Sequence, residues 1–291
     1  MGGGSFDMSS FRSYSRSVGK MVDSRGYVTS GQTFKSYQLD ESLSPKNVIR
    51  ECANSKEHPN TLPVILALDV TGSMGSACKR TAEALGTIMC NLLEEHKNDD
   101  IEFMVMGIGD MECDSAPVQA SQFESDVRIA KALDKIYMEH GGGGNSYESY
   151  SAAWLFGLKQ TKLDCFDKQG KKGIIITMGD EPLNPTLPRS ACENFLGEEC
   201  KIQCDVDTKK LYSEASKKFD IYHISIDDDD TSYSSYKGRI EKTFGQLLGT
   251  RSKVATINSL PTVIESCISE TITERNGGTV LNETNGGEVS W

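Results

Sequence analysis

Several features that define other classes of protein are missing from this chain of 291 residues. No apolar run approaches the roughly 20 residues that a helix needs to cross a bilayer. Residues 1–6 include neither a basic segment nor an apolar one, so they do not predict a signal peptide. Phe6 stands where a myristoylation signal needs Ser or Thr. We therefore expect a soluble protein that has no membrane segment and is not secreted by the usual route.

An excess of positive charge is missing too. The chain has 31 Lys+Arg against 42 Asp+Glu, a net charge of -11. This balance argues against nucleic acid or an anionic membrane surface as the partner, and it suits a divalent metal or a cationic partner better. The nine cysteines are an odd set scattered from Cys52 to Cys267, unlike the dense framework of small secreted domains. We expect a reduced, cytoplasmic protein.

Motifs for catalysis, nucleotide binding or zinc are scarce. The glycine run 141–144 is not followed by Gly-Lys-Ser/Thr and has no basic residue nearby, which disfavours phosphate binding. No Ser or Cys lies in a G-x-S-x-G elbow. Cys192, Cys200 and Cys204 have no fourth ligand close in sequence, so packing thiols are favoured over a zinc site. The sequence does not predict an enzyme.

Composition divides the chain into three parts. The first part is rich in Ser, Gly and Tyr and poor in long apolar runs, whereas the last turns polar and glycine-rich. We assign an N-terminal extension, a domain and a polar C-terminal tail to residues 1–60, 61–275 and 276–291.

The N-terminal extension contains weak signals for local structure. Alternating residues predict a possible hairpin formed by 27–29 and 33–37, and Ser44-Pro45 predicts the start of a short helix that runs through Glu51. An arm that becomes ordered only on a partner is an equally good interpretation.

From Leu62 onward, apolar runs of strand length alternate with helical patterns. This alternation predicts an α/β fold, in which a doubly wound, mostly parallel six-stranded sheet has helices on both faces. Strands are expected at 62–69, 101–108, 118–123, 172–177, 220–226 and 253–256. The third comes too soon for a full crossover, so we expect it to be a short antiparallel edge strand. Helices are expected at 76–95, 125–139, 147–161, 207–218, 233–248 and 260–274.

The most informative segment is the end of the first of these strands. There the apolar run ends in D-x-T-x-S, formed by Asp69, Thr71 and Ser73. These oxygens can converge on one small hard cation, which takes oxygen ligands in octahedral geometry. Such a segment alone is more often a turn with Asx-type capping. Two further loops with suitable oxygens follow later elements, at 141–149 and after the strand at 172–177. Three such loops together favour a metal site over a simple turn.

The D-x-T-x-S segment resembles the metal-ion-dependent adhesion site of the von Willebrand factor A (VWA) family, and the order of predicted elements over 62–275 is similar to the VWA architecture. The resemblance implies a doubly wound fold with Mg2+ (or Mn2+) at the top of the sheet, where a partner protein supplies an Asp or Glu to the metal. A narrower similarity, to a poorly characterised intracellular subgroup of bacteria and phages, rests on Thr33-Phe-Lys-Ser36, Arg50-Glu-Cys52, Glu57-His-Pro59, Gln122–Asp126 and Gly141–Ser149.

The resemblance also implies roles for individual residues. Thr71 and Ser73 would bind the metal directly, and Asp69 would act largely through water. Asp180 would hold a metal-bound water, because it matches the second acidic residue of the family after the strand at 172–177.

The loop between these two elements departs from the family pattern. Where the family usually has a threonine, the loop 141–149 offers Asn145 or Ser146. We choose Asn145 as the ligand, since an amide carbonyl can bind Mg2+, and keep Ser146 as the alternative.

Other carboxylates lie near these loops in sequence. We expect Asp110 to be a solvated loop residue rather than part of the site, and Glu148 and Glu181 to be charges near helix N-termini. The run 227–230 is favoured as a solvated acidic loop over a second cation site.

The function that these expectations favour is a metal-dependent module for protein binding or assembly. Two hydroxyls and one amide would leave the cation under-neutralised and receptive to an outside carboxylate. One alternative is a structural, self-assembling subunit of a phage or filament that associates through residues 1–60. A metal-dependent hydrolase is less favoured, since no general base is evident beside the site.

Overall fold

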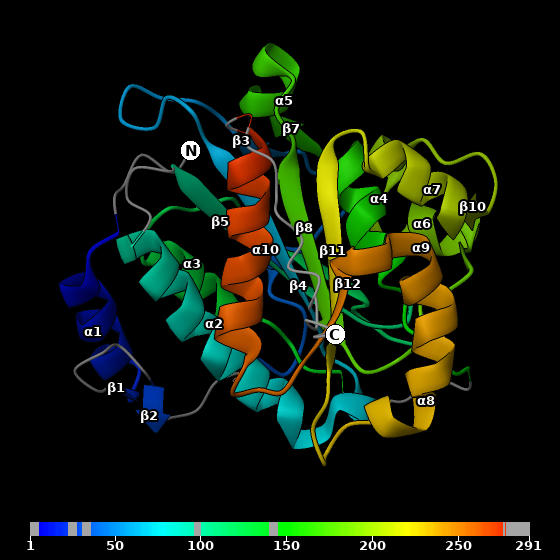
Figure 1. Ribbon diagram of the computed structural model, residues 1–291, viewed down its shortest axis with the longest axis horizontal. Helices are drawn as coiled ribbons and strands as arrows, with labels where there is room; N and C mark the ends of the chain where they lie inside the picture. The colour runs from blue at the N-terminus through cyan, green and yellow to red at the C-terminus, as the bar shows by residue number, and fades with distance from the viewer. Residues whose placement is uncertain are drawn as a thin grey trace, which may run out of the picture.

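The computed structural model describes residues 6–22, 28–30, 36–95, 100–139, 145–275 and 277. A six-stranded sheet runs through the molecule (Figure 1). Its strands are, in order across the sheet, β12 (Ser252–Ala255), β11 (Phe219–Ile226), β8 (Gly173–Gly179), β4 (Leu62–Asp69), β5 (Ile101–Ile108) and β6 (Val118–Ala120). Neighbouring strands are parallel except β6, which is antiparallel to β5. The predicted α/β class with a mostly parallel sheet is confirmed.

The antiparallel edge strand is shorter than the predicted 118–123. Ser121 interrupts the ladder, because its hydroxyl accepts a hydrogen bond from the backbone N–H of Val105 at 3.0 Å. Pairing with β5 returns only as an isolated bridge between Phe103 and Glu124.

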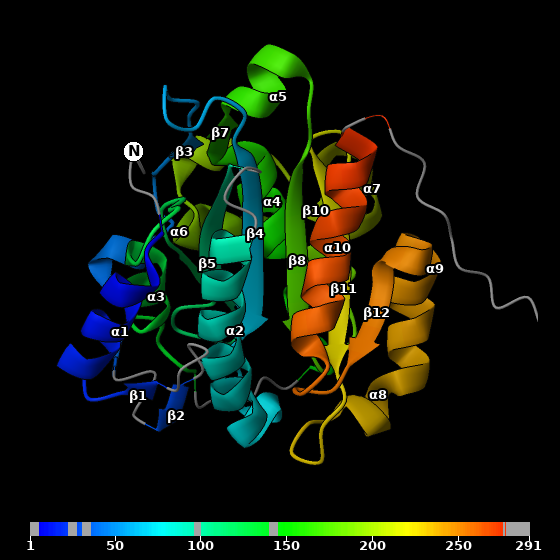
Figure 2. The same cartoon turned by 60° about the vertical axis from the view of Figure 1, so that its left-hand side comes forward.

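Helices cover both faces of the sheet (Figure 2). One layer consists of α1 (Met8–Ser17), α2 (Gly75–Glu95), α3 (Arg128–Leu133) and α10 (Leu260–Arg275). The other consists of α4 (Ser151–Lys159), α6 (Arg189–Phe195), α7 (Thr208–Ala215), α8 (Tyr233–Ile240) and α9 (Gln246–Leu248). The short helix α5 (Asp164–Gln169) lies near the amino end of β8, at the top of Figure 1.

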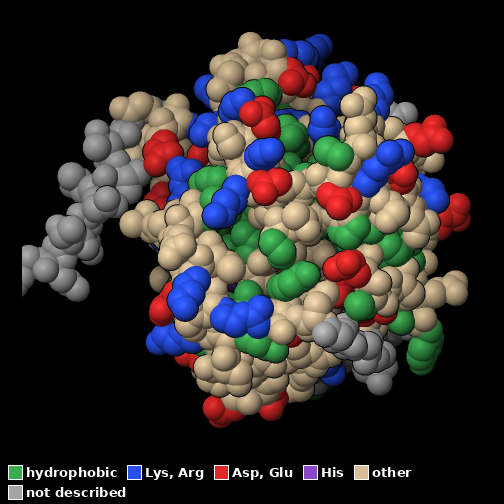
Figure 3. Space-filling view, turned by 90° about the vertical axis from the view of Figure 1, so that its right-hand side faces the viewer, with side chains coloured by type: hydrophobic (Ala, Val, Ile, Leu, Met, Phe, Trp, Pro, Cys, Tyr) green, Lys and Arg blue, Asp and Glu red, His purple; other side chains and the backbone are tan. Residues whose placement is uncertain are grey.

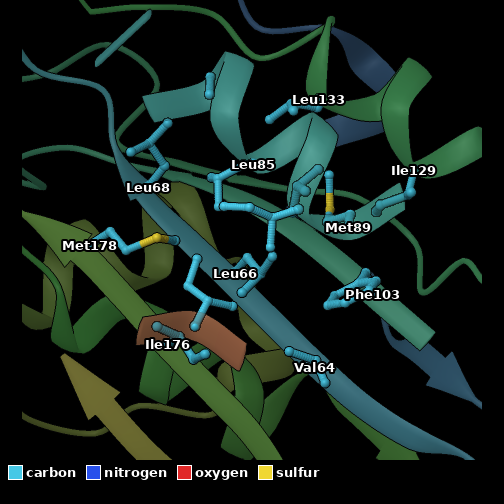
Figure 4. Packing of buried hydrophobic residues seen from close by; sticks show 14 of the residues in the cluster. Val64, Leu66, Leu68, Leu85, Met89, Phe103, Ile129, Leu133, Ile176 and Met178 are labelled. Atoms are coloured by element: carbon cyan, nitrogen blue, oxygen red, sulfur yellow. The ribbon is translucent and has the colours of Figure 1, made fainter. Parts of the chain in front are cut away.

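The central strands β4, β5 and β8 are buried on both faces, as expected for a parallel sheet between two helical layers. Alternate residues of β4 therefore enter different cores. Val64 and Leu66 pack with Leu85 of α2 (Figure 4), whereas Ile65 and Ala67 pack in the core on the other face. Burying each large aliphatic side chain stabilises the fold by about 2 kcal/mol, so the sheet is a firm base for the loops at its ends.

The predicted helix at 125–139 is wrong over much of its length, since α3 ends at Leu133. The reason is a tertiary contact with the edge strand. The side chain of Gln119 accepts from the backbone N–H of Tyr137 at 2.8 Å and donates to its carbonyl at 2.7 Å. These bonds take up the polar backbone groups that a continuing helix would have used.

Two other helix predictions also need correction. The helix predicted at 147–161 is shorter at both ends, because the backbone of Glu148 pairs with the segment after β8 and the chain after α4 enters β7 (Thr161–Leu163). The helix predicted at 44–51 is wrong, because its end belongs to β3 (Arg50–Cys52), which pairs in parallel with β7.

The remaining helix predictions agree with the structure. α2, α7 and α10 fall where helical periodicity placed them, and the helix predicted at 233–248 consists of α8 and α9 joined by a π-helical turn at Glu241–Gly245. A short antiparallel pair, β9 (Thr186–Leu187) and β10 (Val206–Asp207), lies in the long connection before α7. Within the described part of the chain, no helix is both long and apolar enough to cross a membrane.

The described residues of the N-terminal part pack against the sheet domain. Phe11 of α1 is buried in the core that contains α2 and α3. The Tyr14 hydroxyl donates to Asp134 Oδ2 at 2.7 Å, and Lys20 forms an ion pair with the same carboxylate. This helix therefore belongs to one helical layer of the molecule (Figure 2).

A hairpin does occur in this part of the chain, with a different partner strand. β2 (Val28–Ser30) overlaps the first strand predicted at 27–29, but it pairs with the preceding β1 (Met21–Val22). The second predicted strand, 33–37, lies mostly outside the described residues, as does the tail 276–291 apart from residue 277.

Candidate metal centre

The loops that follow β4, β5, β8 and β11 meet at one edge of the sheet, because the carboxyl ends of these parallel strands lie together. This is the lower edge in Figure 1. In open α/β sheets, such an edge is the usual place for a ligand site.

The loop after β4 brings its three predicted site residues together. Asp69 Oδ1 accepts from the backbone N–H of Thr71 at 2.9 Å and from its hydroxyl at 2.6 Å. Thr71 Oγ1 and Ser73 Oγ lie 3.1 Å apart. The 3₁₀ turn Gly72–Met74 and the start of α2 at Gly75 hold Ser73 in this position.

Asp180, the predicted acidic residue after β8, joins the same group. Its Oδ1 accepts from the Ser73 hydroxyl at 3.0 Å, and its Oδ2 accepts from the backbone N–H of Ser232 at 2.6 Å. Four of the predicted site residues therefore form one continuous set of contacts, which runs from Asp69 through Thr71 and Ser73 to Asp180.

Asn145 makes a different contact. Its side-chain amide donates to Asp110 Oδ2 at 2.6 Å, and no described contact joins it to the set just defined. Ser146, the alternative, is half-buried beside it, and the glycines 141–144 before them lie outside the described residues.

Asp110 is buried rather than solvated, so the expectation for this residue is wrong. Its Oδ1 accepts from the backbone N–H of Glu112 at 2.8 Å, and the backbone N–H of Asp110 donates to Asp114 Oδ2 at 2.7 Å. A Cβ on Gly109 would lie 2.3 Å from Asp114 Oδ2 and 3.5 Å from the Thr71 methyl group. The loop after β5 is therefore folded tightly against the site.

Sequence reasoning missed two residues at the centre of the site, Tyr150 and Gly179. The Tyr150 hydroxyl donates to Asp69 Oδ2 at 2.6 Å and lies 3.3 Å from the backbone nitrogen of Glu181, whose N–H it accepts. A Cβ on Gly179 would lie 2.0 Å from that hydroxyl and 2.7 Å from Asp69 Oδ2. Only glycine leaves room for this pair of side chains, and nothing in the local sequence indicates it.

The site concentrates buried carboxylates. Burial and the nearby charge of Asp180 raise the pKa of Asp69 well above its ordinary value. Burial and the charge of Asp69 raise the pKa of Glu148 in the same way. For Glu181, burial and the charge of Asp180 raise the pKa to about 7, although a hydrogen bond with Ser73 acts in the opposite direction. Without a cation, this edge of the sheet resists full ionisation.

The acidic run 227–230 is also partly tied down rather than a freely solvated loop. Arg80 of α2 donates to both oxygens of Asp228, at 3.0 and 2.6 Å, and to Asp230 Oδ2 at 2.9 Å. The same loop continues to Ser232, whose N–H reaches Asp180. The loop 227–232 therefore joins α2, through Arg80, to Asp180 of the site.

The donor set fits a small hard cation only if hydroxyls take part. Among the described residues, no three His, Cys, Asp or Glu side chains converge closely enough to hold a metal by themselves. The hydroxyls of Thr71 and Ser73 supply two neutral oxygens between two carboxylates, which is a set suited to Mg2+ or Mn2+ with water in its shell. Cys192 and Cys200 are buried packing thiols, and Cys204 is exposed.

Comparison with known proteins finds likeness in fold only. No protein-family model matches the chain, and no curated protein does. The pilus adhesin SpaC from Lactobacillus rhamnosus GG, in its open conformation, matches with a TM-score of 0.50 and 10% identity over 79% of this chain and 31% of that chain. The vWF domain of the type V pili tip protein Mfa5 from Porphyromonas gingivalis has a TM-score of 0.44 and 11% identity, over 79% of this chain and 98% of the other.

At this identity, the SpaC match shows a shared fold and carries no information about activity or metal. This chain spans about a third of the SpaC chain, 31% of its length. The class that the fold defines is an α/β domain with a mostly parallel six-stranded sheet and one antiparallel edge strand.

Proposed function

We propose that this protein is a VWA-type module for protein binding and assembly, in which Mg2+ or Mn2+ at the carboxyl edge of the sheet engages an Asp or Glu of a partner protein. The observation that supports this proposal is the continuous set of contacts from Asp69 through Thr71 and Ser73 to Asp180. The shared fold with a pilus adhesin is in keeping with a role in protein association.

The residues of this set would have different roles in metal binding. Thr71 and Ser73 present neutral oxygens, while Asp69 and Asp180 hold those hydroxyls in place through bonds of 2.6 and 3.0 Å. Asn145 uses its amide nitrogen for Asp110, and its carbonyl oxygen would be the ligand that this loop supplies. A bound divalent cation would supply an open coordination position that attracts an outside carboxylate.

The partner and the location complete the proposal. A net charge of -11 disfavours nucleic acid, so the partner is a protein with an accessible acidic residue. No disulfide joins any of the nine cysteines, all of which lie among the described residues, and this suits the reducing cytoplasm as the place of action.

Metal binding is tested by calorimetry with Mg2+ and Mn2+ on the full chain. The double variant Thr71→Ala, Ser73→Ala should abolish binding while the protein stays folded, because both residues lie beyond the end of β4. Asn145→Ala should weaken binding more than Ser146→Ala. A double variant that binds either metal like the wild type would refute the site.

Partner engagement is tested by pull-down from the native host with and without chelator. The complex should dissociate on chelation, and Asp69→Ala or Asp180→Ala should have the same effect. If the complex survives both treatments, association does not depend on the metal, and self-assembly through residues 1–60 becomes the better explanation. The packing of Phe11 and Lys20 against their own domain gives that alternative less support at present.

A further inference from the structure

Glu148 is a buried carboxylate near the proposed metal centre that is not among the proposed ligands. The residue is only 4% exposed, and its Oε2 is buried without a hydrogen-bond partner among the described residues. Glu139, a buried carboxylate in the same region, shows the contrast. Its Oε1 accepts from Ser115 Oγ at 2.8 Å and also from the backbone N–H of Ala116. A buried carboxylate oxygen that lacks such donors is costly to keep.

Hydrogen bonds of its backbone fix the position of Glu148. Its N–H donates to Pro182 O at 3.2 Å, and its carbonyl accepts from Asn184 N at 3.3 Å. The next residue, Ser149, accepts the N–H of Met111 at 3.0 Å. One residue further, Tyr150 donates to Asp69, as described above. Three consecutive residues thus bind the loops after β8, β5 and β4 together.

The backbone contacts of Glu148 and the bond from Tyr150 to Asp69 place Glu148 near the proposed metal centre. The largest electrostatic influences on it come from Asp69 and then Glu181. Asp69 holds the hydroxyl of Thr71, and Glu181 directly follows Asp180, which accepts from the Ser73 hydroxyl. Glu148 therefore lies within electrostatic reach of both sides of the hydroxyl pair, where its negative charge is unfavourable unless a cation is present.

We infer that Glu148 is a direct ligand of the cation. The loop before α4 would then contribute a carboxylate to the site, in addition to the Asn145 amide or in place of it. This inference rests on the proposed metal-binding function. No three carboxylates converge among the described residues, so Glu148 would share the cation with Thr71 and Ser73, while Asp69 and Asp180 act through water.

A carboxylate ligand changes what the site can do. With Glu148 in place, the cation's charge is partly neutralised by the protein, so the metal is retained before a partner arrives. A partner carboxylate then completes the coordination shell and is not needed to hold the ion. The site would behave as a pre-loaded binding surface.

The experiment compares Glu148→Gln with the wild type by two measurements on the full chain. Electron paramagnetic resonance of free Mn2+ gives the affinity, and thermal unfolding with chelator gives the stability of the metal-free protein. Glu148→Gln keeps the size of the side chain and removes its charge. We expect Mn2+ affinity to fall at least tenfold while the metal-free protein melts at the same or a higher temperature, because the variant avoids the cost of keeping a carboxylate buried near Asp69. A merely structural role would lower the melting temperature instead.

Glu139→Gln is the matched control, since Glu139 is an equally buried carboxylate that accepts from Ser115 Oγ and from the backbone N–H of Ala116. It should change Mn2+ affinity by no more than about threefold. Wild-type affinity in Glu148→Gln, or an equal loss in Glu139→Gln, would overturn the inference.

The failure of this inference is distinguishable from failure of the proposed function. If Thr71→Ala with Ser73→Ala abolishes Mn2+ binding but Glu148→Gln does not weaken it, the metal centre stands and Glu148 is not a ligand. If the wild-type protein binds no Mn2+, both proposals are wrong.

Discussion

Both ends of the parallel sheet bury carboxylates, but the two ends treat them differently. At the amino end of β11, Asp220 is 4% exposed and forms ion pairs with Arg251 at 2.9 Å and Lys172 at 3.4 Å. At the carboxyl end, Asp69 and Glu148 are equally buried, yet no ion pair joins either of them to a basic side chain among the described residues. Their strongest neighbours are hydroxyls and other carboxylates.

Under the proposed function, the carboxylate at the amino end is structural and those at the carboxyl end take part in metal binding. A buried carboxylate that is paired with a Lys or Arg side chain is neutralised within the protein and requires no ion from solution. Buried carboxylates grouped without a basic partner raise the energy of the protein alone, and this is characteristic of sites that take their cation from solution. The predictions below test whether the two ends of the sheet differ in this way.

The largest effect is expected from Gly179→Ala. The new methyl group would lie 2.0 Å from the Tyr150 hydroxyl and 2.7 Å from Asp69 Oδ2, in a site where both side chains are fully buried. We expect a loss on the order of 4 kcal/mol in the free energy of unfolding, together with loss of metal binding. Urea unfolding and calorimetry measure the two losses. The control is Gly238→Ala in α8, where a Cβ meets nothing within 4 Å and stability should be unchanged or higher. Equal effects at the two glycines would contradict the close packing described for the site.

At the opposite end of the sheet, Asp220→Asn should destabilise the protein whether or not metal is present. Removing one partner of a buried ion pair typically costs about 3 to 5 kcal/mol, and the lower end applies here because Arg251 is 25% exposed. Urea unfolding with chelator and with Mn2+ should give the same loss. The exposed pair of Lys217 and Glu214 provides the control, since Lys217→Ala should have almost no effect. If Asp220→Asn and Glu148→Gln had the same sign of effect in the metal-free protein, the contrast between the two ends would fail.

The third prediction concerns how stability depends on pH, which reports on the carboxylates at the carboxyl end of the sheet. The pKa of Glu181 is raised to about 7 by burial and by Asp180, and that of Asp69 is raised as well. The folded protein therefore holds protons that the unfolded chain has lost, so stability falls as pH rises through these values. His223 has the opposite sign, because burial lowers its pKa from 6.5 to about 3, but its contribution is complete above pH 6.5.

The informative range is therefore pH 6.5 to 8, since Lys218, with a pKa lowered to about 8, begins to add stability only above it. In this range the metal-free protein should melt at progressively lower temperature, and saturating Mn2+ should reduce the slope. Melting curves with chelator and with Mn2+ measure both. A flat or rising profile in chelator would show that the carboxylates at this end are not strained.

The parts of the site that could be predicted from sequence are those that local chemistry dictates. Asp69, Thr71 and Ser73 stand at alternate positions after an apolar run, and Asp180 follows another such run, so strand ends alone place them at one edge of the sheet. Glu148 could be noticed only as an acidic residue near a helix, because its burial depends on contacts with segments distant in sequence.

The same distinction explains the errors in the fold. Strands and long helices follow from apolar periodicity, which a single segment contains. The helix predicted over 125–139 ends early because Gln119, far away in sequence, binds the backbone of Tyr137. Tyr150 and Gly179 belong to this group too, since their roles exist only when β4, β8 and α4 are brought together.

The smallest effect is expected from Arg80→Ala, which tests whether residues outside the buried edge support the proposed metal site. Arg80 is 43% exposed, so its ion pairs with Asp228 and Asp230 are largely screened by solvent and should contribute about 0.5 kcal/mol to stability. The loop that they hold also carries Ser232, whose N–H binds Asp180 Oδ2. We therefore expect Mn2+ affinity to fall by about twofold, the equivalent of that energy, and the loss to shrink in high salt, where the wild-type ion pairs are already weak. Lys79→Ala is the matched control, because Lys79 is the neighbouring basic residue of α2 and pairs only loosely, at 3.9 Å, with Glu83. If the two variants bind Mn2+ equally well, the acidic loop stabilises α2 without shaping the metal centre, and the centre depends only on the buried contacts at the end of the sheet.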